Sequence, residues 1–134
     1  MSDACLHLKV ITPARVVVDS EADAVTLPGA LGALGILPGH AHLMAALRIG
    51  ELTYRTAGRE HFLAIHKGFA EVAANEVMVL ADIAELPEEI DVALARAEKA
   101  AAEEAMKSAV SEEFDTRRAR LEGAVTRTTV GHHR

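Results

Sequence analysis

Apolar and polar residues alternate through the first two thirds of the chain. In the opening segment, Leu6, Leu8 and Val10 alternate with the polar residues His7 and Lys9. Because successive side chains of a strand point to opposite faces, this period of two predicts a strand with one buried face. Similar short runs, separated by glycine, proline and asparagine, recur up to about residue 86. The pattern therefore predicts an all-β sandwich or barrel in this part of the chain.

A different pattern begins after residue 86, where the chain becomes rich in alanine and charged residues and contains no glycine before Gly123. Pro87, followed by three acids in "PEEID", is typical of the first turn of a helix. We expect one helix of about five turns from this point, judged by the helical spacing of its apolar residues. A serine-containing break then separates it from a second helix that starts at about Glu112.

Both predicted helices carry only a thin apolar stripe. In the first helix the stripe consists of Ile90, Leu94, Ala97, Ala101 and Ala105. In the second it consists of Phe114, Leu121, Ala124 and Val125. Stripes of this width can pack closely against another helix or a sheet edge, but they bury little area. We therefore expect this half of the chain to be mobile and marginally stable, with a tail that frays after about residue 128.

Length, charge and cysteine content narrow the classes of function. The chain has 134 residues, enough for one or two small domains, and its net charge of −6 argues against binding nucleic acid by phosphate neutralisation. The single cysteine, Cys5, excludes an internal disulfide, and the polar N-terminus lacks the pattern of a signal peptide, so we expect a cytosolic location. No apolar run approaches the ~20 residues of a membrane-spanning helix. Membrane association is therefore expected only through a partner.

Two histidines, His40 and His42, follow a Pro-Gly turn with one residue between them. On a strand both would point to one side, as a metal site requires, and "GHAH" is similar to part of the first motif of metal-binding cupins. The carboxylate of that motif is missing, because Ala45, Ala46 and Leu47 occupy the corresponding region. We favour a turn histidine bonded to the backbone, since a metal site needs several convergent ligands. No nucleophilic triad motif appears, so we expect neither catalysis nor a cofactor.

The segment "PGALGALGILPG" is rich in glycine and small apolar residues. It leads into strand-like sequence rather than a helix N-terminus and contains no lysine, so it does not match a phosphate-binding loop. Its composition suits a surface on which a partner docks, and an ordinary connecting loop is the equal alternative on these grounds.

The stretch "LPGALGALGILPGHAHLMAALRIGEL" resembles the signature region of the epsilon subunit of F-type ATP synthases. The block "FLAIHKGFAEVAANEVMVLADIAE" and the helical opening "EEIDVALARA" follow at the spacing of that family, so the resemblance covers about residues 4–115. It implies an α+β, mainly β fold, with a ten-stranded antiparallel β-sandwich over residues 1–86. An antiparallel two-helix hairpin with a regulatory role is expected over residues 87–134.

The resemblance also implies a function. Members of the family are non-catalytic subunits of the central stalk, or rotor, which bind the gamma subunit and the c-ring and couple proton flow to ATP synthesis. Their helices can inhibit ATP hydrolysis. For this chain the expected location is the cytoplasmic face of a bacterial inner membrane, as part of the complex. A metal-dependent cupin-like enzyme using His40 and His42, and a β-sandwich adaptor with a helical arm, are the alternative hypotheses.

Several residues take expected roles from the resemblance. His40 matches the family's "PGHA" turn, at the end of the sandwich that faces the c-ring. The residues expected to dock on the ring are Leu31, Ala33, Leu34, Ile36 and His40. Where the family often has acids, in "EGELGI", this chain has Leu31 and Ala33, so we expect an apolar contact in place of a charged one. His66 and Lys67 replace a small dipeptide of many members, for which the sequence offers no physical reason.

Some members of the family bind ATP through a pattern of Ile or Leu, Asp, two residues, Arg and Ala at the start of the first helix. Here Ile90 and Asp91 are present, but Arg96 comes five residues after the acid rather than three. At 100° per residue, Asp91 and Arg96 would be about 140° apart around a helix and would not readily clamp one ligand. We therefore expect weak ATP binding or none.

The end of the chain is strongly basic. From Thr116 onward there are five arginines against the single acid Glu122. A solvated helix face is the ordinary interpretation of such charges. The resemblance instead implies that the second helix can extend and meet an acidic loop of the catalytic beta subunit. We predict that Arg117, Arg118 and Arg120 form this inhibitory contact.

Overall fold

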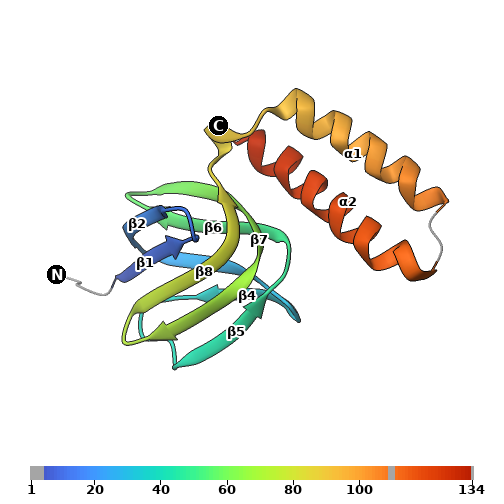
Figure 1. Ribbon diagram of the computed structural model, residues 1–134. Coiled ribbons are helices and arrows are strands. Elements are labelled where there is room, and N and C mark those ends of the chain that lie inside the picture. The colour runs from blue at the N-terminus through green and yellow to red at the C-terminus, as the bar shows by residue number, and fades with distance from the viewer. Residues whose placement is uncertain (1–4, 109–110, 134) are drawn as a thin grey trace.

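The structure is a computed structural model that describes residues 5–108 and 111–133. A β-sandwich of eight strands is followed by a short 3-10 helix and two α-helices (Figure 1). The strands are β1 (Leu6–Ile11), β2 (Val16–Ala22), β3 (Ala24–Gly29), β4 (Gly32–Ile36), β5 (Leu43–Leu47), β6 (Gly50–Thr56), β7 (Arg59–Ala73) and β8 (Glu76–Glu85). The helices are η1 (Pro87–Glu89), α1 (Val92–Lys107) and α2 (Ser111–Gly131). The predicted sandwich followed by a helical hairpin is confirmed.

The strands form one hydrogen-bonded sheet in the order β2-β1-β8-β7-β5-β3-β4, and β6 lies beside β3 and β7. Most neighbouring strands are antiparallel, as predicted. The exception is β1 with β8, which pair in parallel from His7 opposite Glu76 to Ile11 opposite Leu80. The first strand of the chain is therefore joined to the last.

The resemblance implied ten strands, and the described residues form eight. The main reason is β7, where the segments "HFLAIH" and "FAEVAA" form one strand of 15 residues that pairs with β6 and then with β5. Lys67 and Gly68 lie at the junction, with φ angles of 63° and 155°. A Cβ at Gly68 would collide with the carbonyl oxygen of Leu80 on β8. Glycine is thus required at this point of the pairing between β7 and β8.

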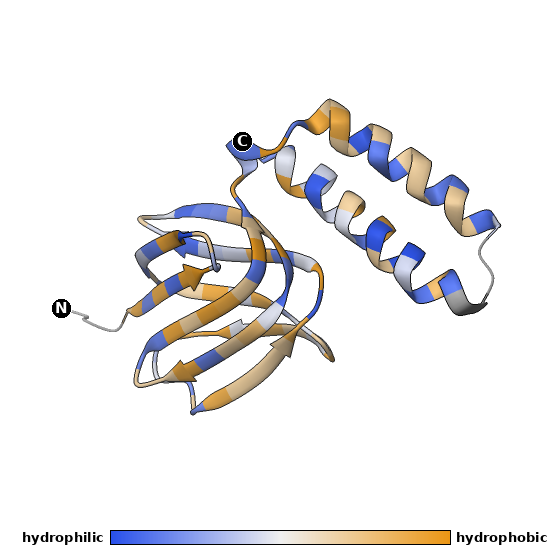
Figure 2. Cartoon of the chain, in the orientation of Figure 1, coloured by the Kyte–Doolittle hydropathy of each residue, from blue (hydrophilic) through white to orange (hydrophobic). Residues whose placement is uncertain are grey.

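The core of the sandwich consists of large aliphatic side chains. Along β1 and β8 the buried and exposed positions alternate, as the period of two predicted. Figure 2 shows this alternation along the strands, whereas apolar and polar residues are mixed on the helices. The largest fully buried side chains of the sandwich are Leu6, Leu8, Val10, Val25, Leu27, Ile36, Leu52, Leu63, Ile65, Val72 and Val77.

The connection between the sandwich and the hairpin is tied to both. Leu86 packs against the sandwich core and Pro87 is buried. The Glu89 carboxylate accepts hydrogen bonds from the Leu86 N–H at 2.9 Å and from the Arg15 guanidinium at 2.7 Å. The Arg15 guanidinium and the Leu86 N–H hold the pKa of Glu89 below its ordinary value. These contacts anchor η1 against the turn between β1 and β2.

The apolar stripe predicted on the first helix is out of phase. The buried residues of α1 are Ala95 and Ala102, whereas Leu94, Ala97 and Ala101 are exposed. The reason is that Ile90 precedes the helix in extended backbone, so a helical period counted from Ile90 starts too early. Ile90 itself is buried, in a small cluster with Ala64, Ala95 and Val130.

The tail of the chain is ordered helix rather than frayed. We expected fraying after about residue 128, but α2 continues to Gly131 and Val130 is fully buried. Contact with the sandwich, absent from the local sequence signal, accounts for this. Of the apolar stripe predicted on the second helix, Ala124 is buried, whereas Phe114 and Val125 are exposed. In the described part of the chain, no helix is long and apolar enough to span a membrane.

Candidate interaction surfaces

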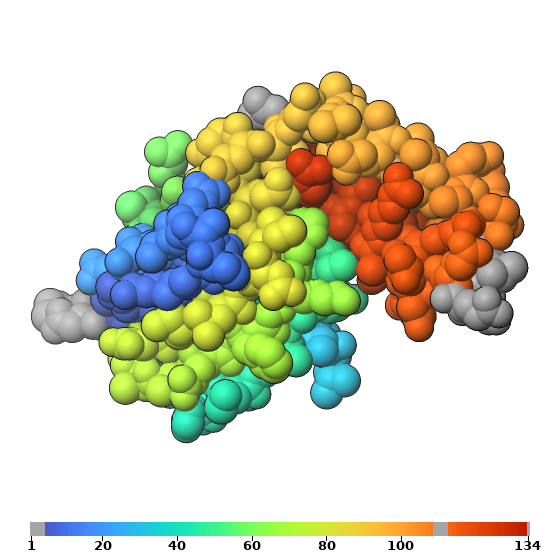
Figure 3. All heavy atoms as spheres, viewed as in Figure 1, coloured from blue at the N-terminus to red at the C-terminus, as the bar shows by residue number. Residues whose placement is uncertain are grey.

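The turn between β3 and β4 carries the most exposed large apolar side chain. Leu31 is fully exposed, at 105% of its reference area. The turn needs glycine at two positions. A Cβ at Gly29 would collide with the carbonyl oxygen of Gly32, and Gly32 itself has a φ of 135°. In Figure 3 the light-blue atoms of this segment project from the lower side of the molecule, away from the helices. A leucine at the tip of a glycine-built turn points to solvent rather than to the core, which makes it a candidate contact residue.

The other predicted docking residues are divided between the surface and the core. Ala33 is exposed, and Leu34 is half-buried against the core. Beside them lies a hollow of about 310 Å³ lined mainly by apolar groups, including Leu31, Leu34 and Met44. Ile36 is 1% exposed and belongs to the sandwich core, so its side chain is not available for the predicted contact. The sequence could not separate it, because Ile36 and Leu34 share one face of β4.

His40 and His42, which follow this region, have different partners. His40 has its N–H bonded to the Leu37 carbonyl at 3.1 Å, and its Nδ1 lies 2.7 Å from the Ala41 carbonyl oxygen. His42 pairs instead with Glu71 on β7, with 3.1 Å between Nε2 and Oε2. Within the residues that the structure describes, no group of three or more metal-ligating side chains is found. The backbone-bonded turn histidine predicted for His40 is what the structure shows.

An apolar strip, which the sequence pattern did not predict, lies on the outer face of the sheet. Phe69 on β7 and Leu80 on β8 face each other across the strands and are 63% and 53% exposed. Ala46 on β5 pairs with Phe69, and Ile11 on β1 pairs with Leu80. We call Ile11, Ala46, Phe69 and Leu80 the outer strip; it borders a hollow of about 620 Å³.

A sequence signal for the outer strip does exist. Phe69 shares its face of β7 with Glu71, and Leu80 shares its face of β8 with Asp82, so a charged residue marks each face as exposed to solvent. Two large apolar residues opposite each other on a solvent face are a candidate interface. The sequence alone did not reveal that the two residues are neighbours, because register was not predicted.

The residues considered for ATP binding are not brought together. Asp91 is the N-cap of α1, and its carboxylate accepts the Leu94 N–H at 3.0 Å. Ile90 is buried, and Arg96 contacts His132 after α2, with 3.1 Å between Nη2 and Nε2. Each residue therefore has a structural partner in this arrangement.

The three arginines predicted as an inhibitory contact differ in their surroundings. Arg117 donates to the Ala105 carbonyl at 2.6 Å, to Ser108 Oγ at 3.3 Å and to Glu113 at 2.7 Å. It thus caps the C-terminal end of α1 from α2. Arg118 and Arg120 are exposed. In this state Arg117 is used within the hairpin, whereas Arg118 and Arg120 are exposed on different sides of α2.

A charged cluster joins α2 to the sandwich. Arg127 bridges two carboxylates: Nε lies 2.9 Å from Glu85 at the end of β8, and Nη1 lies 3.1 Å from Glu98 on α1. Nε2 of His66, on β7, lies 3.4 Å from Oε1 of Glu85. His66 is the largest cause of the lowered pKa of Glu85, and burial acts in the opposite direction. A Cβ at Gly123 would lie 3.3 Å from the His66 ring. The structure thus gives His66 a role: it fills the crossing between β7 and α2.

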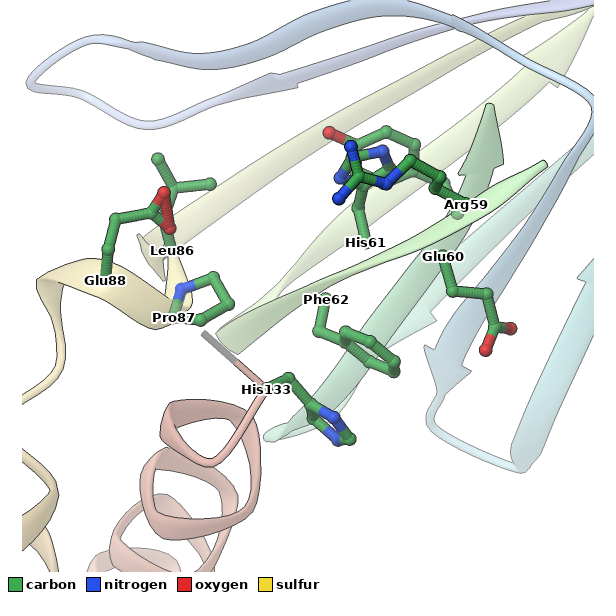
Figure 4. A pocket seen from close by; sticks show the side chains of 9 residues that line it. Arg59, Glu60, His61, Phe62, Leu86, Pro87, Glu88 and His133 are labelled. Atoms are coloured by element: carbon green, nitrogen blue, oxygen red, sulfur yellow. The ribbon is translucent and has the colours of Figure 1, made fainter. Parts of the chain in front are cut away.

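A second contact lies at the end of α2, shown in Figure 4. The ring of His133 stacks on that of Phe62 from β7, with centroids 3.6 Å apart and planes inclined by 8°. The hollow beside them has a volume of about 450 Å³, and its lining includes Tyr54, His61 and Pro87. The two contacts together fix the hairpin to one end of the sandwich.

The architecture is that of a β-sandwich with exposed apolar patches and an appended helical hairpin. The sequence profile of the family described as ATP synthase, Delta/Epsilon chain, beta-sandwich domain, matches residues 5–87. The chain belongs to this family. This match and several relatives that carry the name ATP synthase epsilon chain confirm the predicted resemblance to the epsilon subunit of F-type ATP synthases.

Relatives from three bacteria illustrate the similarity. The chain is 50% identical to the ATP synthase epsilon chain of Lawsonia intracellularis over 94 residues, which cover 70% of this chain and 71% of that one. It is 44% identical over 110 residues to the epsilon chain of Thermodesulfovibrio yellowstonii, covering 82% and 79%. It is 40% identical over 127 residues to the epsilon chain of Nitratidesulfovibrio vulgaris, covering 93% and 94%.

Solved structures share the fold. A chain in the mitochondrial ATP synthase of Euglena gracilis, solved with OSCP, F1 and the c-ring, superposes with a TM-score of 0.79 at 22% identity, covering 91% of this chain and 78% of that one. A chain from the central stalk and c-ring of the Tetrahymena thermophila enzyme gives 0.63 at 14% identity, covering 94% and 96%. At these identities the likeness concerns the fold alone.

Proposed function

We propose that the chain is a central-stalk subunit of a proton-translocating F-type ATP synthase and catalyses no reaction of its own. It binds the gamma subunit and the c-ring, couples proton flow to ATP synthesis, and is held by them at the cytoplasmic face of a bacterial inner membrane. Family membership and the epsilon-chain relatives support this role. The observation that carries the residue-level proposal is the pairing of exposed Phe69 with exposed Leu80.

The outer strip is the surface that we assign to gamma. It lies on the broad outer face of the sheet, where four strands contribute neighbouring apolar side chains. Burying such side chains stabilises an association by about 25 cal/mol for each Å² removed from water, before the cost of ordering the partners. A long partner laid across the strands would cover Phe69 and Leu80 together.

Co-purification tests this assignment. The double variant Phe69→Asp and Leu80→Asp, expressed together with gamma, should lose gamma from the purified complex, because two carboxylates would have to be buried in the interface. The matched control is Leu94→Asp, on α1, whose side chain is 52% exposed and lies outside the strip. Retention of gamma at the wild-type level by a correctly folded double variant would refute the assignment.

The turn between β3 and β4 is the surface that we assign to the c-ring. Leu31, Ala33 and the adjoining hollow give it an apolar character. His40, the other residue assigned to this contact, follows β4 in the loop whose Gly39 N–H donates to Asn75 Oδ1, in the turn between β7 and β8, at 2.7 Å. The hairpin lies at the other end of β8, which finishes at Glu85.

Crosslinking tests the orientation. In a Cys5→Ser background, Leu31→Cys and Ala33→Cys should crosslink to cysteines in the polar loops of the ring, whereas Arg59→Cys should not. Arg59 begins β7 at the end nearer the hairpin, beside the hollow that contains His133. Crosslinking from Arg59→Cys alone would show that the docking end has been assigned in reverse.

The inhibitory role of the helices is the regulatory part of the proposal. Arg118 and Arg120 are exposed in the docked hairpin, and Arg117 joins them only after giving up its bonds to α1. Alanine at all three positions should raise ATP hydrolysis by the reconstituted complex, by an amount that shrinks as salt screens the contact with the beta subunit. Unchanged hydrolysis at low and high salt, with the subunit still bound, would return these arginines to an ordinary solvated surface.

A further inference from the structure

The hairpin touches the sandwich through two contacts of different chemistry. One is the ion pair of Arg127 with Glu85, at the end of β8. The other lies where α2 ends, with Val130 fully buried and His133 stacked on Phe62. Releasing the hairpin would break both contacts. The second contact contains a titratable ring, which makes its strength dependent on protonation.

His133 also faces a carboxylate of the sandwich. Its Nε2 lies 3.4 Å from Oε2 of Glu51 on β6. That oxygen is shielded from solvent and has no hydrogen-bond partner among the described residues. A protonated ring supplies the positive charge that this shielded oxygen lacks, whereas a neutral ring does not.

The wider surroundings of His133 are more acidic than basic. The charged and titratable side chains near it are Glu51 and Tyr54 from β6, Arg59, Glu60 and His61 from β7, Glu88 from η1, and the adjacent His132, which contacts Arg96 of α1. Burial raises the pKa of Glu51, His133 lowers it, and Glu60 raises it further. Ionised Glu51 is thus costly in the docked state unless His133 is charged.

We propose that His133 and Glu51 make docking of the hairpin proton-dependent, so that the docked state gains population as the pH falls. In the docked state the imidazolium lies next to the Glu51 carboxylate. In the released state both groups are in water and separate. The docked state therefore binds more protons than the released state, and its share must rise as the pH falls. Protonation of Glu51 at lower pH acts in the same direction.

A second histidine works against this effect. His66 shares Glu85 with Arg127, so a protonated His66 weakens the hold of Arg127 on that carboxylate. The pair of His66 and Glu85 lies within the sandwich and persists after release. An Arg127→Gln background removes this opposing effect and also weakens docking, which brings both states into a measurable range.

The expected effect is modest. His133 and Glu51 are 35% and 30% exposed, so solvent screens their attraction. An exposed ion pair of this kind changes an equilibrium about two- to fivefold. Only the consequence rests on the proposed function: a more acidic cytoplasm would hold the helices on the sandwich, away from the catalytic subunits.

Single-molecule energy transfer on the isolated full chain tests the proposal. Fluorophores are attached at Asp82→Cys on β8 and Asp115→Cys on α2, in a background with Cys5→Ser and Arg127→Gln. The ratio of docked to released molecules should rise about threefold from pH 8 to pH 6. His133→Phe, which keeps a ring against Phe62, and Glu51→Gln should keep docking but flatten this dependence.

The control is His42→Phe, which removes a histidine paired with a glutamate at 3.1 Å elsewhere on the sandwich. It should leave the pH dependence unchanged. The proposal is overturned if the ratio does not change between pH 8 and pH 6, or if His133→Phe or Glu51→Gln retains the full dependence. Because the measurement needs no other subunit, its failure leaves the assignment to the ATP synthase untouched.

Discussion

The sandwich and the helical hairpin are held together by different kinds of contact. Large aliphatic side chains fill the sandwich, and full burial of each contributes about 1.5–3 kcal/mol. The two helices meet through small residues, Ala95, Ala102 and Ala124, which bury much less area. The hairpin therefore depends more on the charged contacts of Arg117 and Arg127. Stability in the sandwich comes from packing, whereas the position of the hairpin comes from contacts that salt and pH can alter.

The largest expected effect concerns Gly68 in the middle of β7. Gly68→Ala should lower the free energy of unfolding of the sandwich by about 2–6 kcal/mol, because the new Cβ meets the Leu80 carbonyl and the backbone favours glycine. Gly58→Ala is the control, since its φ is 76° but open space surrounds it. It should cost about 1 kcal/mol. Equal losses in urea unfolding would show that the contact with β8 is unimportant.

The second effect concerns the aliphatic core. Leu63→Ala on β7, at a fully buried position, should cost the sandwich about 2–5 kcal/mol in urea unfolding. The loss should not depend on salt, since no charged group is involved. A strong dependence on salt would contradict the division of the molecule into a packed and a charge-held region.

The third effect concerns the interface between α1 and α2. Ala102→Leu should destabilise the hairpin by about 1–3 kcal/mol, because the small-residue interface leaves no space for a larger side chain. Ala100→Leu, at an exposed position of the same helix, should be nearly neutral. Helical circular dichroism during heating compares the two. If both variants melt alike, α1 and α2 do not pack as closely as described.

The smallest expected effect is that of removing the hairpin from the sandwich. A fragment ending at Leu86, which packs on the sandwich core, should remain soluble and unfold cooperatively. The cut exposes Phe62 and Ala64. Their exposure should lower the free energy of unfolding only a little, because the rest of the core is intact. The division at residue 86 stays a prediction until this is done. An unfolded fragment would show that the sandwich needs the hairpin.

The fold was more predictable than the interaction surfaces. Alternation along β1 and β8 reflects burial on one side of a sheet, which the local sequence records directly. Contacts between distant segments leave no such record. The stacking of His133 on Phe62, which orders the tail, joins positions 71 residues apart in number and could not be inferred from either segment. The phase of α1 was wrong for a local reason, the extended conformation of Ile90.

The exposed apolar surfaces were predicted only in part, for a related reason. Leu31 was identified because a large apolar residue in a glycine-rich turn is visible in the sequence. Ile36 was included wrongly, since the same run of residues leaves the surface and enters the core. Phe69 and Leu80 were missed because their importance lies in being neighbours across two strands. Register, rather than composition, creates that surface.

The parallel pairing of β1 with β8 also bears on how the protein is made. The residues of β1 leave the ribosome early, but their partners Glu76 to Leu80 are synthesised much later. Until then, one edge of β1 lacks its neighbour and the sheet cannot close. Pairings between segments so far apart in sequence form slowly, because a long loop must close first. Completion of the sandwich therefore waits for β8, and α1 and α2, which follow it, emerge onto a domain that has just become able to receive them.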